Sequence, residues 1–363
     1  MNVFVAIMLV FAAVGFIDKM FDLKWGLAVS FDKGLLTMAT MIIPIVGLSS
    51  IGVELMQRNI DAIAAATSDL PFDPSLIPGA ILATDIGGFF MAEQLTTNET
   101  LLILNGVILA SLLGQTVSFQ LPVFLSALER SDFYVAIKGF IIGLILVPCG
   151  LVAAGLMLRM DVELFLRQVI PILILCILLA AGLIKFPEQM VKGFSLFARV
   201  IQWIIYLMFF FAMLGVFIPS LAYAEMDAIE EAAMIVLKSA IVISGSLVMS
   251  ELVLKFFRTK LQKIADRLGI NEVSMVALLL NCATSLAILP LFSRMDRKGK
   301  MLNAAFSVSG AYVLGGQLGF VSSVISGYPI TVYVVSKVVC GGLSLFVMYK
   351  MYDRLEKPTS KIA

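Results

Sequence analysis

The chain has 363 residues, of which 60% are hydrophobic and 14% charged, and its mean hydropathy is +1.02. Soluble domains are about 45–50% apolar, so this composition excludes an ordinary water-soluble protein and indicates an all-α polytopic membrane protein. The formal net charge of +1 and the lack of a long basic tract give no reason to expect a nucleic-acid partner.

Hydrophobic blocks between charge clusters predict nine membrane-spanning helices. In chain order they cover residues 2–17, 34–57, 100–127, 134–158, 163–184, 195–223, 231–256, 300–326 and 328–351. The first block has no basic region before it and no small-residue cleavage motif after it, so we expect it to be a retained span rather than a signal peptide.

Two further apolar segments, 77–95 and 272–292, are shorter and interrupted by glycine or polar residues. Both flanks of 272–292 are rich in Lys and Arg, whereas 59–75 and 96–100, on either side of 77–95, contain neither. Because Lys and Arg gather on the cytoplasmic side, the flanks of 77–95 are predicted outside and those of 272–292 inside. Each segment is therefore predicted to enter the membrane, break, and return to its own side, giving two re-entrant elements.

The same charge rule predicts an external N-terminus and a cytoplasmic C-terminus, the latter from Lys350, Arg354, Lys357 and Lys361. The order of elements then divides the chain into a first repeat (1–158), a linker helix (159–194) and a second repeat (195–363), the two repeats being inverted. Asn105 matches Asn303, and Ser111 matches Ser309. An inverted repeat with interrupted elements at the membrane midplane is typical of secondary transporters.

Enzyme functions are disfavoured. The chain contains no histidine, and it has no GxxxxGK[ST] motif that would bind ATP. The four cysteines lie in apolar segments without CxxC spacing and are interpreted as packing residues: Cys149, Cys176, Cys282 and Cys340. We therefore expect no catalytic residue, cofactor or metal.

Asp85 is the most informative candidate, because intramembrane carboxylates mark substrate or ion pathways. It follows Thr84 and precedes Gly87 and Gly88, where the backbone can turn sharply or approach a ligand. Its carboxylate would bind a cationic solute or a coupling ion; the alternative is that it caps the half-helix that begins at Gly87.

Neutral polar residues mark further candidate positions. Asn281, Thr284 and Ser285 occupy the corresponding break in the second repeat, where they would bind a hydroxyl or satisfy a helix end. A second group has the same two interpretations, substrate contact or hydrogen bonding between helices, and comprises Gln115, Thr116, Ser118 and Gln317.

Charged residues nearer the ends of the spans are interpreted as solvated. Glu54 and Glu251 are expected at the membrane interface. Lys138, Lys238 and Lys337 are expected to snorkel to the surface, although Lys337 is deep enough to pair with a carboxylate.

Three stretches together resemble the EutH family of ethanolamine utilisation permeases: TDIGGFFMAEQL (84–95), GQTVSFQLPV (114–123) and RMDRKGKMLNAAFSVSGAYVLGGQLGF (294–320). The resemblance implies a bacterial inner-membrane protein that moves ethanolamine, a small ammonium ion with a hydroxyl. Asp85 would suit the ammonium group, and Asn281 the hydroxyl.

Two positions depart from the pattern expected of the family. Gly316-Gln317 replaces an acidic-plus-imidazole pair, and Asn281-Cys282-Ala283-Thr284 replaces Asn-Asn-Ile-Pro. A related small amine or alcohol is therefore an alternative substrate, and a channel-like conduit or a membrane-embedded sensor is an alternative function. The sequence leaves the oligomeric state open, a homo-oligomer included.

Overall fold

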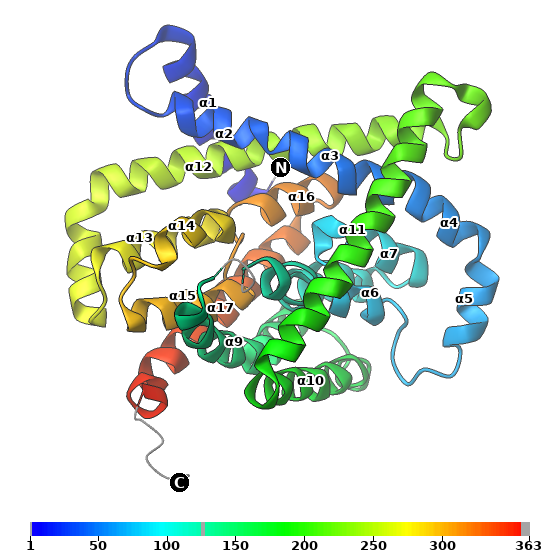
Figure 1. Cartoon of the computed structure of the whole chain (residues 1–363). Coiled ribbons are helices and arrows are strands. Elements are labelled where there is room, and N and C mark those ends of the chain that lie inside the picture. Colours follow the sequence, from blue (N-terminus) through cyan, green and yellow to red (C-terminus); the bar gives the residue numbers. More distant parts are fainter. Residues whose placement is uncertain (1, 125–127, 357–363) are drawn as a thin grey trace.

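The computed structural model describes residues 2–124 and 128–356, and every regular element within these ranges is a helix (Figure 1). The prediction of an all-α fold is therefore confirmed. Lys357 and Lys361, part of the argument for a cytoplasmic C-terminus, lie outside the described residues.

The first part of the chain forms α1 (Val3–Phe21), α2 (Ala28–Leu36), α3 (Met38–Val46), η1 (Gly47–Gly52), α4 (Val53–Arg58), α5 (Ile60–Thr67), α6 (Leu76–Ile81), η2 (Thr84–Ile86), α7 (Gly88–Leu95), α8 (Glu99–Leu101), η3 (Leu102–Gly114), η4 (Thr116–Phe124) and α9 (Arg130–Met157). Elements η1, η3 and η4 are wound as wide π-helical turns, a geometry that is rare and often found at functional sites.

The remainder forms α10 (Val162–Lys185), α11 (Pro187–Phe217), η5 (Pro219–Leu221), α12 (Met226–Leu268), α13 (Glu272–Ala283), η6 (Ser285–Ile288), α14 (Leu289–Phe292), α15 (Arg297–Ser309), α16 (Gly316–Val324) and α17 (Tyr328–Glu356).

Eight helical stretches in the described ranges are long and apolar enough to cross a bilayer. They are Val3–Phe21, Ala28–Arg58, Glu99–Leu121, Arg130–Met157, Val162–Lys185, Pro187–Phe217, Met226–Leu268 and Tyr328–Leu355. Apolar side chains remain exposed along α10 and α11, for example Leu178 and Trp203, which gives these two helices a surface suited to lipid.

The segment predicted as a single span over 300–326 is instead divided into α15 and α16. Between them, the backbone N–H groups of Tyr312 and Leu314 donate to the carbonyls of Asn281 and Cys282, both at 3.0 Å. The chain leaves its helix here because the end of α13 supplies the hydrogen-bond acceptors that a continuous helix would supply itself.

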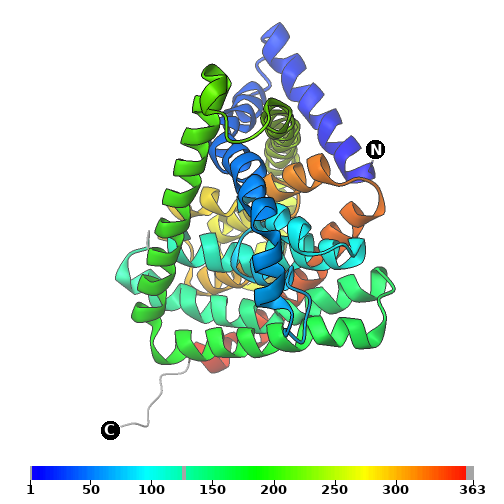
Figure 2. The same ribbon diagram turned by 90° about the vertical axis from the view of Figure 1, so that its right-hand side faces the viewer.

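Both segments predicted to be interrupted are broken in the structure. Segment 77–95 forms α6, η2 and α7, and segment 272–292 forms α13, η6 and α14. The two broken segments lie on opposite sides of the molecule in Figure 1, and after the 90° turn of Figure 2 the cyan segment lies in front of the yellow one. This arrangement brings the two breaks toward each other in the interior.

Helix packing joins early and late parts of the chain. Helix α12 packs against α1, α2 and α3, and α11 packs against η1 and η4. On the other side of the core, α9 packs against α15 and α17, and η3 also contacts both α15 and α17. The breaks are therefore enclosed by helices from both ends of the sequence.

The sidedness of the two broken segments can be tested with single cysteines. Asp69 and Thr97 flank α6 and α7, Arg267 and Arg294 flank α13 and α14, and all four positions are exposed. If each segment returns to its own side, Asp69→Cys and Thr97→Cys will react with an impermeant maleimide on intact cells. Arg267→Cys and Arg294→Cys will react only after permeabilisation.

The parent chain is the control, because its native cysteines are buried or half-buried: Cys149, Cys176, Cys282 and Cys340. Labelling of one member of a pair from outside and the other from inside would mean that the segment crosses the membrane.

Candidate substrate-binding site

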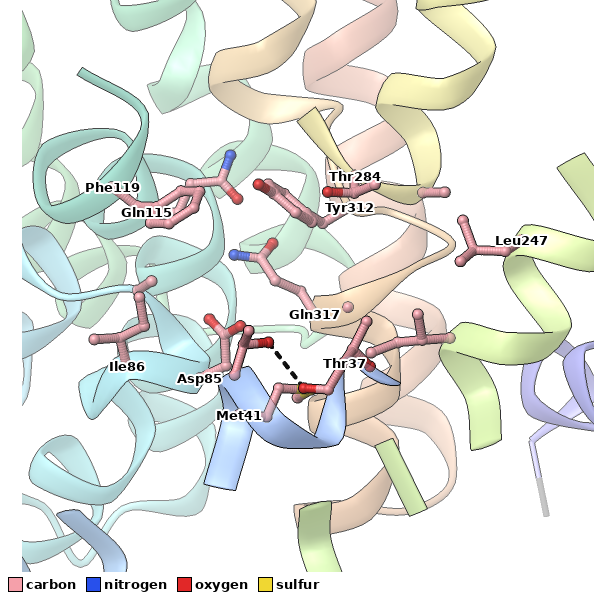
Figure 3. Close-up of a pocket in the computed structure, with 15 residues that line it drawn as sticks. Thr37, Met41, Asp85, Ile86, Gln115, Phe119, Leu247, Thr284, Tyr312 and Gln317 are labelled. Atoms are coloured by element: carbon pink, nitrogen blue, oxygen red, sulfur yellow. Dashed lines mark hydrogen bonds between the residues drawn. The ribbon is translucent and has the colours of Figure 1, made fainter. Parts of the chain in front are cut away.

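A cavity of about 190 Å³ lies where the two breaks meet. Its lining comes from α2–α3, η2, η3–η4, α12, the end of α13 and the start of α16. The lining residues are Thr37, Thr40, Met41, Ala83, Asp85, Ile86, Gln115, Phe119, Ile243, Leu247, Ala283, Thr284, Tyr312, Gly316 and Gln317 (Figure 3). Most of the wall is apolar, with a few polar groups facing inward, the usual make-up of a small-molecule site.

Asp85 contributes a carboxylate to this cavity. Among the described residues, no other side chain forms a hydrogen bond or ion pair with it. The alternative in which Asp85 caps the following half-helix does not fit: the N-cap of α7 is Gly87, with φ +96°, and no side chain caps that helix. The charge therefore faces the cavity instead of a helix end.

Gln317, which is 2% exposed, lines the same cavity as Asp85. Figure 3 shows its amide group between the Asp85 carboxylate on one side and the side chains of Gln115 and Tyr312 on the other. Its Oε1 accepts a hydrogen bond of 2.7 Å from Lys337 Nζ. Because the oxygen is engaged, the amide nitrogen is the group that Gln317 offers to the cavity.

Gln115 leaves an acceptor without a partner. Its Nε2 donates to the carbonyl oxygens of Ser307 and Val308 at 3.0 and 3.4 Å. Its Oε1 is buried and has no hydrogen-bond partner within residues 2–124 and 128–356. A buried polar atom of this kind is costly and is usually satisfied, which makes Oε1 a candidate ligand acceptor.

Tyr312 is a lining residue that the sequence did not suggest. Its φ of +62° lies in the left-handed region, which non-glycine residues seldom adopt and which is often found at functional sites. Its hydroxyl is 2.6 Å from Ser285 Oγ, and Ser285 Oγ donates to Gln120 Oε1 at 3.1 Å. Of the residues predicted at the second break, Thr284 lines the cavity and Ser285 holds Tyr312.

The other predicted residues support the walls instead of lining the cavity. Thr84 Oγ1 donates to Gly106 O, and Thr116 Oγ1 donates to Leu112 O and Val308 O. Ser118 Oγ donates to Gly114 O and accepts from Ala83 N. Gly88 begins α7, and a Cβ added there would lie 2.6 Å from Leu82 O.

Asn281 is fully buried near the cavity but does not line it. Its Nδ2 donates to Asn303 O at 3.2 Å and to Ser307 Oγ at 2.9 Å. Asn281 therefore joins α13 to α15.

Lys337 does not snorkel as predicted. Its side chain is 0% exposed, because α17 turns it toward the interior, where Nζ donates to Ser111 O and Gln317 Oε1. Lys138 is half-buried and donates to Leu355 O at 2.8 Å. Glu54 pairs with Arg58 at 2.7 Å, and Glu251 is exposed, in keeping with their interpretation as solvated residues.

A second cavity of about 410 Å³ adjoins the first. The two share Thr40, Ile86 and Phe119, and the second extends to Gln202 and Tyr206 on α11. The Phe119 ring also meets the Tyr312 ring edge-on, with 6.4 Å between centroids. Phe119 therefore belongs to the wall that the two cavities share.

Replacing Asn281 tests whether it is a structural link. Asn281→Ala removes two buried hydrogen bonds, so the free energy of unfolding should fall by about 1–3 kcal/mol. The measurement is the unfolding temperature of the purified protein in detergent. Ser336→Ala is the matched control, because the buried Ser336 hydroxyl has no hydrogen-bond partner in the described part of the chain and its loss should change little. Equal unfolding temperatures for wild type and Asn281→Ala would contradict the structural role.

Comparison with known proteins gives one family. The model of the family described as "Ethanolamine utilisation protein, EutH" matches residues 1–351. No solved structure matches the chain.

Curated relatives agree with this match. A protein of Listeria monocytogenes named "Probable ethanolamine permease EutH" is 28% identical over 98% of this chain and 95% of its own length. A Salmonella typhimurium protein with the same name is 28% identical over 81% of this chain and 78% of its own length. Bacillus subtilis YxeR, described as uncharacterised, is 27% identical over 88% of this chain and 86% of its own length. Since the family match covers nearly every residue, the chain belongs to the EutH family of ethanolamine utilisation proteins.

Proposed function

We propose that this protein is a permease that carries ethanolamine, or a closely related small amino alcohol, across a bacterial cytoplasmic membrane. The observation that carries the proposal is the Asp85 carboxylate, which lines an interior cavity and has no side-chain partner among the described residues. An intramembrane carboxylate is costly, and a substrate cation is the partner that would compensate for its charge.

The other polar groups of the cavity suit the rest of an amino alcohol. Gln115 Oε1 is an unpartnered acceptor for an N–H or O–H of the substrate. The Gln317 amide nitrogen and the Thr284 hydroxyl also lie in the lining, where they would bind the substrate hydroxyl. The apolar walls at Met41, Phe119 and Leu247 lower the polarity around the site, which strengthens the attraction between Asp85 and an ammonium ion.

The relatives' printed names favour ethanolamine. A related amino alcohol is an alternative substrate, because both departures from the family pattern include a lining residue, Gln317 in one and Thr284 in the other. A neutral amide at Gln317 would donate to a hydroxyl without adding a second charge beside Asp85.

Two features support the proposed inverted repeats, 1–158 and 195–363, joined by the linker 159–194. A Cβ added at Gly114 would lie 2.0 Å from Leu82 O, and one added at Gly315 would lie 1.9 Å from Ala283 O. In both halves a glycine thus lets the backbone approach the end of the first helix of the broken segment.

The hydrogen bonds around the matched asparagines are also alike. Asn105 Nδ2 donates to Ser75 Oγ at 2.9 Å, just before α6, and Asn303 Nδ2 donates to Ser274 O at 3.0 Å, at the start of α13. In the proposed topology the N-terminus is outside and the C-terminus cytoplasmic, and the site between the repeats opens to each side in turn.

Replacing Asp85 tests the charge recognition directly. Asp85→Asn keeps the shape of the side chain but removes the attraction between opposite charges. Affinity for ethanolamine should fall at least about tenfold, which is about 1.4 kcal/mol, whereas affinity for neutral ethylene glycol should fall less. The measurement is a binding titration of the purified protein with both ligands.

Glu54→Gln is the matched control, because Glu54 pairs with Arg58 and lies outside the cavity lining. It should leave both affinities unchanged. Equal affinity of wild type and Asp85→Asn for ethanolamine would remove the basis for the proposed site.

Counterflow tests the carrier mechanism. In proteoliposomes preloaded with unlabelled ethanolamine, labelled ethanolamine should accumulate transiently and saturably, because a site that opens to each side in turn exchanges one ligand for another. Flux without saturation or counterflow would indicate a channel-like conduit. Binding without any flux would indicate a sensor.

A further inference from the structure

Lys337 is a buried basic side chain that has no role in the amine binding proposed above. It lies on α17, is 0% exposed, and its Nζ donates two hydrogen bonds of 2.7 Å, to Ser111 O and Gln317 Oε1. Both acceptors are neutral, and among the described residues no ion pair includes Lys337. Its charge must therefore be balanced from further away.

Asp85 is the acidic residue of the cavity that Lys337 reaches through Gln317. Gln317 Oε1 accepts a hydrogen bond from Lys337 Nζ, and Gln317 and Asp85 line the same cavity, where Figure 3 shows the Gln317 amide group above the Asp85 carboxylate. The other titratable groups facing Lys337 are Tyr333 and Cys340, on α17 itself. The Tyr333 hydroxyl donates a hydrogen bond to Tyr312 O, and Cys340 Sγ donates one to Leu146 O, so neither supplies a negative charge.

An ammonium ion bound at Asp85 would upset this balance. The site would then hold two cations and one carboxylate, leaving a positive charge uncompensated in apolar surroundings. Release of one proton from Lys337 restores neutrality. The hydrogen bonds survive this change, because a neutral amine still has two N–H groups and Lys337 has two acceptors in Ser111 O and Gln317 Oε1.

We propose that Lys337 gives up a proton when an amine cation binds beside Asp85, so that the permease exchanges one amine cation for one proton. On binding, the N–H bond of Lys337 breaks and the proton passes to water on the side to which the cavity is open. When the amine leaves on the other side, Lys337 takes a proton back from that side. The full cycle is electroneutral, and the inference rests on the amine site proposed above.

The number of protons released can be measured by titration calorimetry of the full-length protein with ethanolamine. The titration is repeated at one pH in buffers with different enthalpies of protonation. The dependence of the observed heat on the buffer gives the protons released per amine bound, and we expect about one for wild type.

Lys337→Gln should bind ethanolamine with no proton release. Lys138→Gln is the matched control, because Lys138 donates to Leu355 O away from the cavity, and it should release as many protons as wild type. Lys337→Arg gives a second variant if Lys337→Gln does not fold. Arginine keeps its proton, so this variant should release none and bind at least about tenfold more weakly.

Every outcome is decisive. Binding to wild type with heats independent of the buffer would overturn the proton exchange and leave the amine site standing. Proton release that persists in Lys337→Gln or Lys337→Arg would assign the proton to another group, including the amine itself, and would also overturn the exchange. Absence of any ethanolamine binding to wild type would overturn both proposals.

Discussion

Backbone groups that leave a helix inside a membrane protein must find other partners, and this constraint shapes both breaks. At the first break, Ala83 N donates to Ser118 Oγ at 3.0 Å and Gly88 N donates to Ala83 O at 2.9 Å. At the second, the backbone of Tyr312 and Leu314 donates to carbonyls at the end of α13. Hydrogen bonds thus hold each break to a neighbouring element of the same half of the chain, and the cavity lies between the two breaks.

This arrangement provides the polar surroundings that charged groups need. Gln317 and Tyr312 lie at the break between α15 and α16, and Gln115 lies between η3 and η4. All three line the cavity with the carboxylate of Asp85, which would be untenable among apolar side chains alone. The same breaks bring Gln317 within reach of Lys337. The cost of interrupting helices is therefore offset by the hydrogen bonds that hold the breaks, and the breaks in turn allow charge in the interior.

The sequence predicted that both segments are interrupted, because Asp85, Gly87, Gly88 and Asn281 stand out in an apolar background. The charges that flank each segment led to the same prediction. It missed the break between α15 and α16. Residues 310–315 are mainly apolar or glycine, so hydropathy continues through them, and the partners that draw the backbone out of its helix come from α13, a tertiary effect.

Prediction of the site residues from the sequence succeeded and failed for similar reasons. Asp85, Gln115, Thr284 and Gln317 were identifiable as polar residues inside apolar segments. The lining residues Tyr312, Phe119 and Thr37 could not be identified in this way, because aromatic and threonine side chains are ordinary in membrane helices. The snorkelling expected of Lys337 failed for a related reason: the depth of a lysine along a span does not reveal which way the helix turns it.

The two proposed repeats share one close backbone approach but differ in chemistry. Gly114 and Gly315 make the same close approach, yet the first break carries Asp85 where the second carries the neutral Thr284. The lysines also differ: Lys337 on α17 is fully buried, whereas Lys138 on α9 is half-buried. In the proposed arrangement, Asp85 therefore belongs to the first repeat and Lys337, which would balance its charge, to the second. A motion that separates the proposed repeats would leave both charges without compensation. In the proposed cycle an ammonium group bound at Asp85 compensates the carboxylate, and Lys337 becomes neutral by releasing its proton, so neither charge is left uncompensated.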